Sequence, residues 1–254
     1  MRSTSGYVVN PQKLVGLLFI SLACAGSYSV FADTADETYR FEITPYLWVA
    51  TITGSASADG ATSNSSAVDS DYSFFALDNL DGVASLDFSI HRAQWGFLFD
   101  FLYVAYEDKF LESTILEATP RLVGTIVEFA GSYAPEAIDN LDLVVGARQQ
   151  NIEVSLKVLG GVSTANKIWT DPFVGAIYYL PLNEKFSMTF RGDLGGFGIE
   201  SDMAVNFETV VRYQFNDMFS AKLGYRYLKV TFDEDSFVYG IGLSGFLFGL
   251  GIRF

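Results

Sequence analysis

The sequence Phe246-Leu247-Phe248-Gly249-Leu250-Gly251-Ile252-Arg253-Phe254 decides the fold. Every second residue in it is large and apolar, and the residues between include two glycines and an arginine. A repeat of two places successive side chains on opposite faces of a β-strand. Glycine and arginine do not suit the core of a soluble sheet. They do suit the crowded lumen of a β-barrel whose large side chains face lipid.

The same alternation recurs upstream, in 85–91, 186–191, 203–215 and 219–227. It predicts that Phe207, Val211, Leu223 and Phe248 face lipid while Glu208, Arg212, Lys222 and Arg253 face inward. We therefore expect an all-β, antiparallel, up-and-down transmembrane barrel of about ten strands, with eight or twelve as alternatives. The expected strands lie near 39–53, 82–91, 95–106, 117–133, 141–158, 167–180, 186–194, 202–215, 219–232 and 237–254.

Composition agrees with a membrane barrel. Half of the residues are hydrophobic and the mean hydropathy is +0.24. No stretch after Ala32 reaches the roughly 18 uninterrupted apolar residues that suggest a membrane-spanning helix. Alternating strands conceal their hydrophobicity from a window average, and the 23 Phe and 14 Tyr favour a barrel over a large soluble core.

The N-terminus has the pattern of a secretory signal. Arg2 and Lys13 are the only charged residues before Asp33, and an apolar run follows from Leu14 to Ala25. We predict cleavage after Ala32, which leaves 33–254 as a single barrel domain. A lipoprotein signal ending at Cys24 is the alternative, although the leucine before it stands one place too close.

Cys24 is the only cysteine, so the mature chain has no thiol and no disulfide. The 16 basic residues less Arg2 and Lys13 leave 14 against 30 acidic residues, a net charge of −16. An acidic surface of this kind argues against nucleic acid and against acidic ligands.

The connections predict the orientation in the membrane. The sequence predicts tight periplasmic turns at His91–Gln94, Pro181–Lys185 and Asn216–Met218. It predicts a longer turn on the same side at 134–140. Segments 54–71, 160–166 and 195–201 read as outer loops. Both termini then lie in the periplasm. The aromatic residues near the tight turns predict an interfacial girdle: Trp95, Tyr133, Tyr178, Tyr179, Phe186, Tyr213, Phe215, Phe219 and Phe254.

Two features fit this pattern less well. Three prolines fall inside the expected strands: Pro45, Pro120 and Pro172. A proline removes a hydrogen bond between strands, so we expect bulges or strand ends at these positions. Residues 74–80 fit a short helix in the first outer loop better than a strand.

Four motifs carry a resemblance: Ile43-Thr44-Pro45-Tyr46-Leu47-Trp48, Trp169-x-Asp171-Pro172, Arg191-Gly192-Asp193-Leu194-Gly195-Gly196-Phe197-Gly198 and Leu223-Gly224-Tyr225-Arg226-Tyr227. They resemble small, largely uncharacterised Gram-negative outer-membrane barrel proteins, which are similar in kind to OmpA- and OmpW-type barrels. The resemblance implies an outer-membrane location, contact with outer-membrane lipid and lipopolysaccharide, and no particular activity. Phe254 resembles the terminal signal read by the outer-membrane insertion machinery.

The inward face carries the candidate site. Alternation places eight acids inside: Glu42, Asp87, Asp100, Glu128, Asp142, Asp171, Asp193 and Glu208. It places six bases inside: Arg148, Arg191, Arg212, Lys222, Arg226 and Arg253. Opposite charges in an enclosed space should pair, because an unpaired buried charge costs several kcal/mol. The network either fills the lumen, giving a structural or surface-interaction protein, or lines a narrow channel for small solutes.

Other chemistry has weaker support. A hydrolase or acyltransferase of this class needs a histidine with a partner, and His91, the only histidine, falls in a predicted turn. We expect no cofactor and no metal site, although Asp69, Asp71 and Asp233-Glu234-Asp235 in outer loops could hold a divalent cation. Arg191-Gly192-Asp193 spells an adhesion tripeptide, but both of its charges should point inward.

Overall fold

The computed structural model describes residues 38–58, 72–73, 80–107, 118–158, 161–234 and 237–254. The expected signal, Asp69, Asp71, Asp235 and residues 74–79 lie outside these ranges. No helix in the described ranges is long and apolar enough to cross a membrane. The strands are β1 (Arg40–Ala58), β2 (Tyr72–Ser73), β3 (Leu80–Arg92), β4 (Trp95–Glu107), β5 (Ala118–Tyr133), β6 (Leu141–Val158), β7 (Gly161–Pro181), β8 (Phe186–Gly195), β9 (Met203–Gln214), β10 (Phe219–Glu234) and β11 (Phe237–Arg253).

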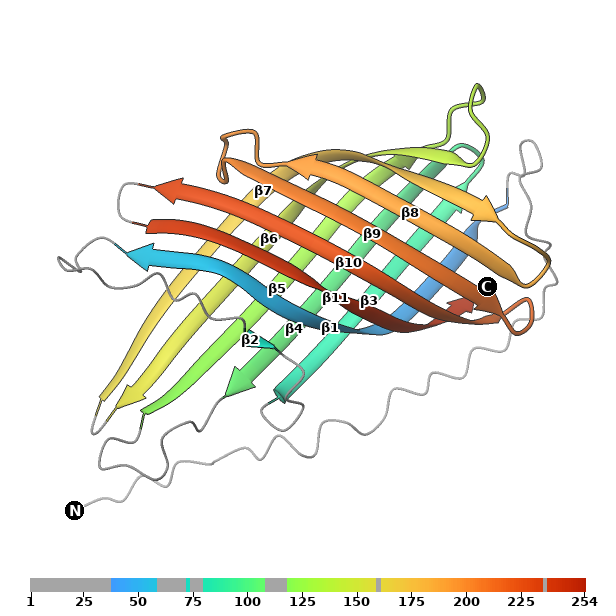
Figure 1. Cartoon of the computed structure of the whole chain (residues 1–254). Helices are drawn as coiled ribbons and strands as arrows, with labels where there is room; N and C mark the ends of the chain where they lie inside the picture. The colour runs from blue at the N-terminus through green and yellow to red at the C-terminus, as the bar shows by residue number, and fades with distance from the viewer. Residues whose placement is uncertain (1–37, 59–71, 74–79, 108–117, 159–160, 235–236) are drawn as a thin grey trace, which may run out of the picture.

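The long strands form a closed antiparallel barrel. From β3 to β11 each strand pairs with the next in sequence, and β1 pairs with both β3 and β11. The strands nearest the viewer, β8 to β11, cross those behind them obliquely (Figure 1), because strands must tilt to close a sheet. Within the described residues the barrel has ten long strands, and β2 is a two-residue addition to the edge of β1. The predicted fold class and strand number are confirmed.

The tight connections and the closing strands meet at one end of the barrel, which we call the turn end. The backbone N–H of Phe41 donates to Phe254 O at 3.0 Å, and that of Phe254 donates to Phe41 O at 3.1 Å. Arg253 N donates to Met218 O in the β9–β10 turn at 2.8 Å. The start of β1 and the C-terminus therefore share the turn end, and we call the opposite end the loop end.

One expected loop is a strand instead. Segment 160–166 was expected as an outer loop because it is small and polar, but β7 begins at Gly161 and pairs with β6 up to Val158. A membrane strand needs about 9–11 residues, whereas β6 has 18 and β7 has 21. The hairpin therefore extends beyond the length that a membrane requires, where alternation no longer needs apolar residues.

The three strand prolines each stand where one neighbouring ladder stops. Pro45 is the last residue of β1 paired with β3, and the β1–β11 ladder omits Thr44 and Pro45. Pro120 lies one residue past the end of the β4–β5 ladder, and Pro172 one residue past that of β7–β8. Strands staggered around a tilted barrel leave such ends unpaired on one side, where the missing N–H breaks no ladder bond. The prolines therefore lie inside β1, β5 and β7, at the ends of ladders rather than at the ends of strands, and at Pro45 the β1–β11 ladder is interrupted.

The two faces of the wall differ as the alternation predicts. Leu223 and Phe248 are about half exposed on the outside, at 51% and 50%, whereas Arg226 on the inward face of β10 is 2% exposed. Aromatic side chains pair on the outer surface near the turn end, with ring centroids 4.9 Å apart in both Trp95–Tyr133 and Phe186–Tyr213.

Candidate functional site

The middle of the lumen holds paired charges on strands from both walls. We call this set the charged layer: Asp100, Glu128, Arg148, Arg191, Asp193, Asn206 and Arg226. Three guanidinium groups face three carboxylates, so the formal charge of the layer is zero. Each side chain reaches the lumen because it occupies the inward position of its strand.

Arg226 crosses the barrel. From β10, its Nη2 contacts Glu128 Oε1 on β5 at 2.5 Å, and its Nη1 donates to Asp100 Oδ2 on β4 at 2.8 Å. β5 is five strands from β10 in either direction around the ring of described strands, so these two face each other across the lumen. Charge-assisted hydrogen bonds therefore join the two walls directly at this level.

Two further arginines join neighbouring walls. Arg148 donates to Glu128 and to Asp193, both at 2.8 Å, and Arg191 donates to Glu128 Oε2 at 2.7 Å and Asp193 Oδ2 at 3.0 Å. The guanidinium carbons of Arg148 and Arg191 lie 4.8 and 5.5 Å from the centre of the Phe173 ring. Glu128 and Asp193 therefore each bind more than one cation, which offsets the cost of burying them.

Neutral groups complete the layer. Asn206 donates to Asp193 Oδ2 at 2.8 Å and accepts from Arg226 Nε at 3.0 Å. The Tyr46 hydroxyl donates to Asp100 Oδ1 at 2.7 Å. These residues bridge charges that would otherwise keep unused hydrogen-bonding atoms in a dry interior.

A second ion cluster lies nearer the turn end, and we call it the mouth cluster: Glu42, Arg212, Lys222 and Arg253. Glu42 on β1 accepts from Arg212 at 2.6 Å and Arg253 at 2.9 Å, and Lys222 Nζ lies 2.5 Å from it. Lys222 also donates to Thr44 Oγ1 at 2.7 Å. Three cations surround one carboxylate, and their side chains remain partly exposed.

Four of the eight predicted lumen acids belong to neither the charged layer nor the mouth cluster: Asp87, Asp142, Asp171 and Glu208. Glu208 comes no closer than 3.9 Å to Arg226 Nε. Asp87 faces the lumen but forms no ion pair among the described residues. Asp171 lies apart from the charged layer, where it accepts from the backbone N–H of Ser201 at 2.9 Å and so anchors the β8–β9 loop.

His91 was expected in a solvated turn, and this is wrong. It belongs to β3, faces inward, and its Nε2 lies 3.6 Å from Asp142 Oδ2. Tyr179 was expected in the outer girdle, but its hydroxyl donates to the same Asp142 oxygen at 3.2 Å. Alternation could have placed both residues, since each has the parity of the inward residues on its strand.

The His91 group does not have the arrangement of a catalytic triad. The Ser132 hydroxyl and the His91 ring both line the space over Gly96. Asp142, however, approaches Nε2, the nitrogen on that same side, rather than orienting the ring from Nδ1 as an orienting acid does. In the described ranges no three residues among His, Cys, Asp and Glu are grouped to hold a metal ion.

An apolar layer covers the charged layer on the side of the loop end: Trp48, Ala50, Leu102, Ile126, Trp169, Ala204, Leu228, Val230 and Leu247. In each of several strands it begins two residues beyond a polar inward residue, as Leu102 follows Asp100 and Leu228 follows Arg226. The Arg226 guanidinium lies 5.2 Å from the centre of the Trp48 ring, so the two layers touch. The predicted inward residues are charged, so this apolar layer is not among the features expected from the sequence.

No protein-family model matches the chain, and no curated protein matches it significantly. Among solved structures, it is similar to Ail, the attachment invasion locus protein of Yersinia pestis (10% identity, 86% of this chain and 100% of that chain, TM-score 0.37). It is also similar to the Pseudomonas putida toluene transporter TodX (9%, 86% and 90%, 0.33) and to Neisserial surface protein A (13%, 87% and 100%, 0.30). At these values we take nothing about function from the similarities.

Proposed function

We propose that this chain is an integral outer-membrane barrel without enzymatic activity, and that its filled lumen prevents it from conducting solutes. Its role is then structural or one of surface interaction, exercised through the loop end. The contact of Arg226 with Glu128 across the lumen carries the proposal. A water-filled channel through this level would have to replace that contact, and breaking a buried, hydrogen-bonded ion pair is costly.

The outer face supports a membrane location. Large apolar side chains are exposed on several strands, among them Phe129, Val145, Leu194, Phe207, Leu223 and Leu250. Soluble proteins rarely expose contiguous apolar surface on this scale, whereas a closed barrel with an apolar exterior is the β-structure that a bilayer accepts. The paired aromatics near the turn end match the girdle at a membrane–water interface.

Barrel size supports a filled lumen. Eight strands enclose an interior that side chains just fill, and 16–18 strands leave an aqueous channel. A ten-stranded barrel lies near the filled limit, and here arginine, tryptophan and phenylalanine side chains occupy the interior.

Planar-bilayer recording of the refolded protein tests the proposal against a narrow channel. We expect little or no steady current from the wild type. Arg212→Ala combined with Arg226→Ala should either open a small conductance or lower the thermal stability of the barrel, since both variants remove a charge that bridges strands. Large, stable, ion-selective currents from the wild type would overturn the filled barrel and establish the channel.

We also propose that Phe254 supports assembly. Its backbone closes the ring against Phe41, and the two side chains stack with centroids 6.0 Å apart. Deleting Phe254 should reduce the yield of heat-modifiable, protease-resistant protein in the outer-membrane fraction more than deleting Ser63 does. Equal yields would contradict this role.

A further inference from the structure

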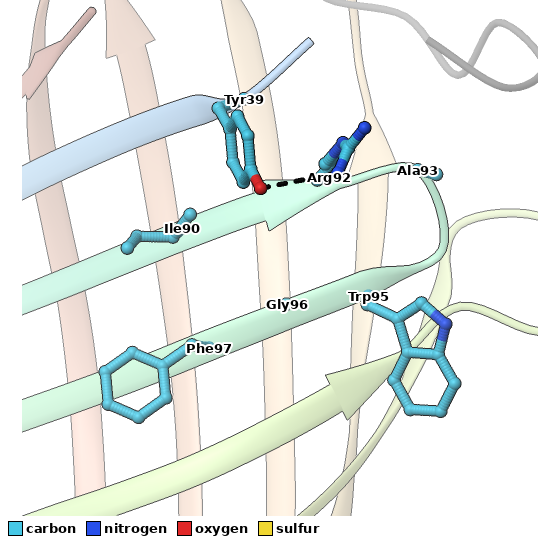
Figure 2. A pocket seen from close by; sticks show the side chains of 7 residues that line it. All are labelled: Tyr39, Ile90, Arg92, Ala93, Trp95, Gly96 and Phe97. Carbon is cyan, nitrogen blue, oxygen red and sulfur yellow. Dashed lines mark hydrogen bonds between the residues drawn. The ribbon is translucent and has the colours of Figure 1, made fainter. Parts of the chain in front are cut away.

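At the loop end, β7 extends well past its neighbour β8. The last residue of β8, Gly195, pairs with Phe173, whereas β7 begins at Gly161. In Figure 1 the paired ends of β6 and β7 run to the lower left, beyond the arrowhead of β8. The turn end differs, because β3 and β4 stay paired up to the turn between them, where Arg92 is in register with Trp95 (Figure 2). The first part of β7 therefore has a paired strand on one side only.

The backbone of that part of β7 leaves hydrogen-bonding groups on its open side. Pro172 O accepts from Gly196 N at 3.1 Å, so the even-numbered residues of β7 direct their N–H and C=O groups toward β8. Tyr179 N donates to Asn140 O beside β6 at 2.8 Å, so the odd-numbered residues direct theirs toward β6. We call the even-numbered residues beyond the end of β8 the open edge: Val162, Thr164, Asn166, Ile168 and Thr170.

The wall beside the open edge lacks two strands. β9 begins at Met203, which pairs with Thr231, and β10 continues to Glu234. Neither β8 nor β9 therefore lies between β7 and β10 at this level. Neighbouring strands of a sheet lie about 4.8 Å apart, so a strand added to β7 would take the position that β8 leaves vacant.

The open edge is accessible and is not blocked by its own sequence. Val162 and Ile168 are 65% and 54% exposed, and the other three residues are exposed as well. Proteins usually protect a free strand edge with charged residues, prolines or bulges, because its unused N–H and C=O groups pair readily with another chain. The residues of the open edge are uncharged, and Pro172 lies beyond its last residue. The open edge therefore keeps its donors and acceptors available.

Acidic side chains flank the open edge. From β6, Glu153 pairs in register with Asn166. Glu200 and Asp202 are exposed in the β8–β9 loop, which bonds to β7 at both of its ends. Lys167 has the inward parity of its strand and so belongs to the other face. Complementary charge therefore favours a basic partner, and it disfavours a second copy of this acidic chain.

We propose that the open edge binds an extended, basic polypeptide segment of a surface partner, which adds to β7 as a further strand. The inference deepens the proposed function and rests on it, because the loop end must face outward. Main-chain bonds to the open edge hold the segment, and the flanking acids select one that carries lysine or arginine. Phe197 and Ile199 in the β8–β9 loop are 56% and 67% exposed, so they are available to its apolar side chains.

Labelled peptides titrated into the refolded protein in uncharged maltoside micelles test the proposal by fluorescence anisotropy. The probe is Lys-Val-Thr-Val-Lys-Val-Thr-Val-Lys, whose valines and threonines favour an extended chain. One control peptide is N-methylated throughout, which keeps the side chains and removes the N–H donors. The other has glutamate in place of lysine. We expect saturable binding of the probe, and a dissociation constant at least about tenfold higher for each control.

A substitution in the protein places the binding on the open edge. Asn166→Pro removes an N–H group at its centre, where the group forms no bond to β6, and it should raise the dissociation constant of the probe about tenfold. Asn166→Thr keeps the N–H group and is the matched control, so its dissociation constant should equal that of the wild type. The heat-modifiable mobility of both variants verifies that they fold.

Equal affinities of the wild type for the probe and for its N-methylated form would overturn strand addition, even if Asn166→Pro did not fold. Equal affinities of Asn166→Pro and Asn166→Thr would overturn the position on β7, and equal binding of the lysine and glutamate peptides would overturn the basic partner. Dimerisation of the wild type that Asn166→Pro abolishes would assign the open edge to a second copy instead. The titration needs neither a bilayer nor a current, so a conducting wild type would contradict the proposed function and leave the peptide result to be read separately.

Discussion

The charged layer and the apolar layer fill adjacent levels of one lumen by different physics. In the charged layer, directed hydrogen bonds between opposite walls fix which side chain meets which, as Arg226 does with Glu128. In the apolar layer, Trp48, Leu228 and their neighbours fill space without such direction. The charged layer therefore sets the register of the walls, and the apolar layer excludes water. Each should respond differently to the loss of a single side chain.

The largest effect is expected in the charged layer. Arg226→Ala leaves Asp100 and Glu128 short of a cation in a buried site, and breaking a buried pair in this way costs about 3–5 kcal/mol. Denaturant unfolding of the refolded barrel in micelles should show this loss. The matched control is Arg121→Gln, whose partner Asp81 lies 3.6 Å away in a largely exposed pair. That variant should change the unfolding free energy by less than about 1 kcal/mol. Equal losses in the two variants would contradict a special contribution of the charged layer to stability.

The apolar layer should respond through cavity formation. Leu228→Ala removes a side chain that is 1% exposed, and we expect a loss of about 3 kcal/mol from transfer and cavity terms. Leu223→Ala on the same strand is the control, because its side chain is 51% exposed on the outer face and lipid or detergent can fill the space. Similar losses at both positions, measured by the same unfolding assay, would mean that Leu228 does not fill a closed interior.

A smaller effect is expected on the outer face. Phe248→Arg places a cation where we propose lipid, and the cost is about 2 kcal/mol, the lower end of the midplane range, because the long arginine side chain can extend its charge toward the membrane surface. The unfolding free energy in lipid vesicles is the measurement. A neutral result would indicate that Phe248 does not face the hydrocarbon.

Much of the fold could be predicted from the sequence, because alternation is a local signal. Strand positions, the ten-strand count and the inward parity of Arg148 and Arg226 follow from it. The membrane boundary leaves no such signal, so the sequence predicts a loop where the polar end of β7 lies. A proline such as Pro172 can be placed only once the stagger of the strands is known.

From the sequence, the candidate site could be predicted only as a set of inward-facing residues, without the contacts between them. Parity states that Arg226 and Glu128 both face inward, but their contact depends on the tilt that brings β10 opposite β5 at one level. Neutral partners were missed for a related reason. Asn206 and Tyr46 carry no charge to attract notice, although each bonds to the layer. Asp87 is the opposite case. Its charge predicts an ion pair, but in the described residues no cation lies close enough to form one.

Accessibility of a cysteine on the far side of the two layers tests their closure most directly. The expected mature chain has no cysteine, so a single one can be read without background. Ser89 faces inward on β3 toward the turn end, and Val104 faces inward on β4 toward the loop end. Each Ser89→Cys or Val104→Cys protein is inserted in vesicles in one orientation, verified by protease digestion, and treated with a small membrane-impermeant thiol reagent. We predict that the reagent labels Ser89→Cys only from the turn end and Val104→Cys only from the loop end. Labelling of Ser89→Cys from the loop end, at a rate near that from the turn end, would contradict a closed lumen.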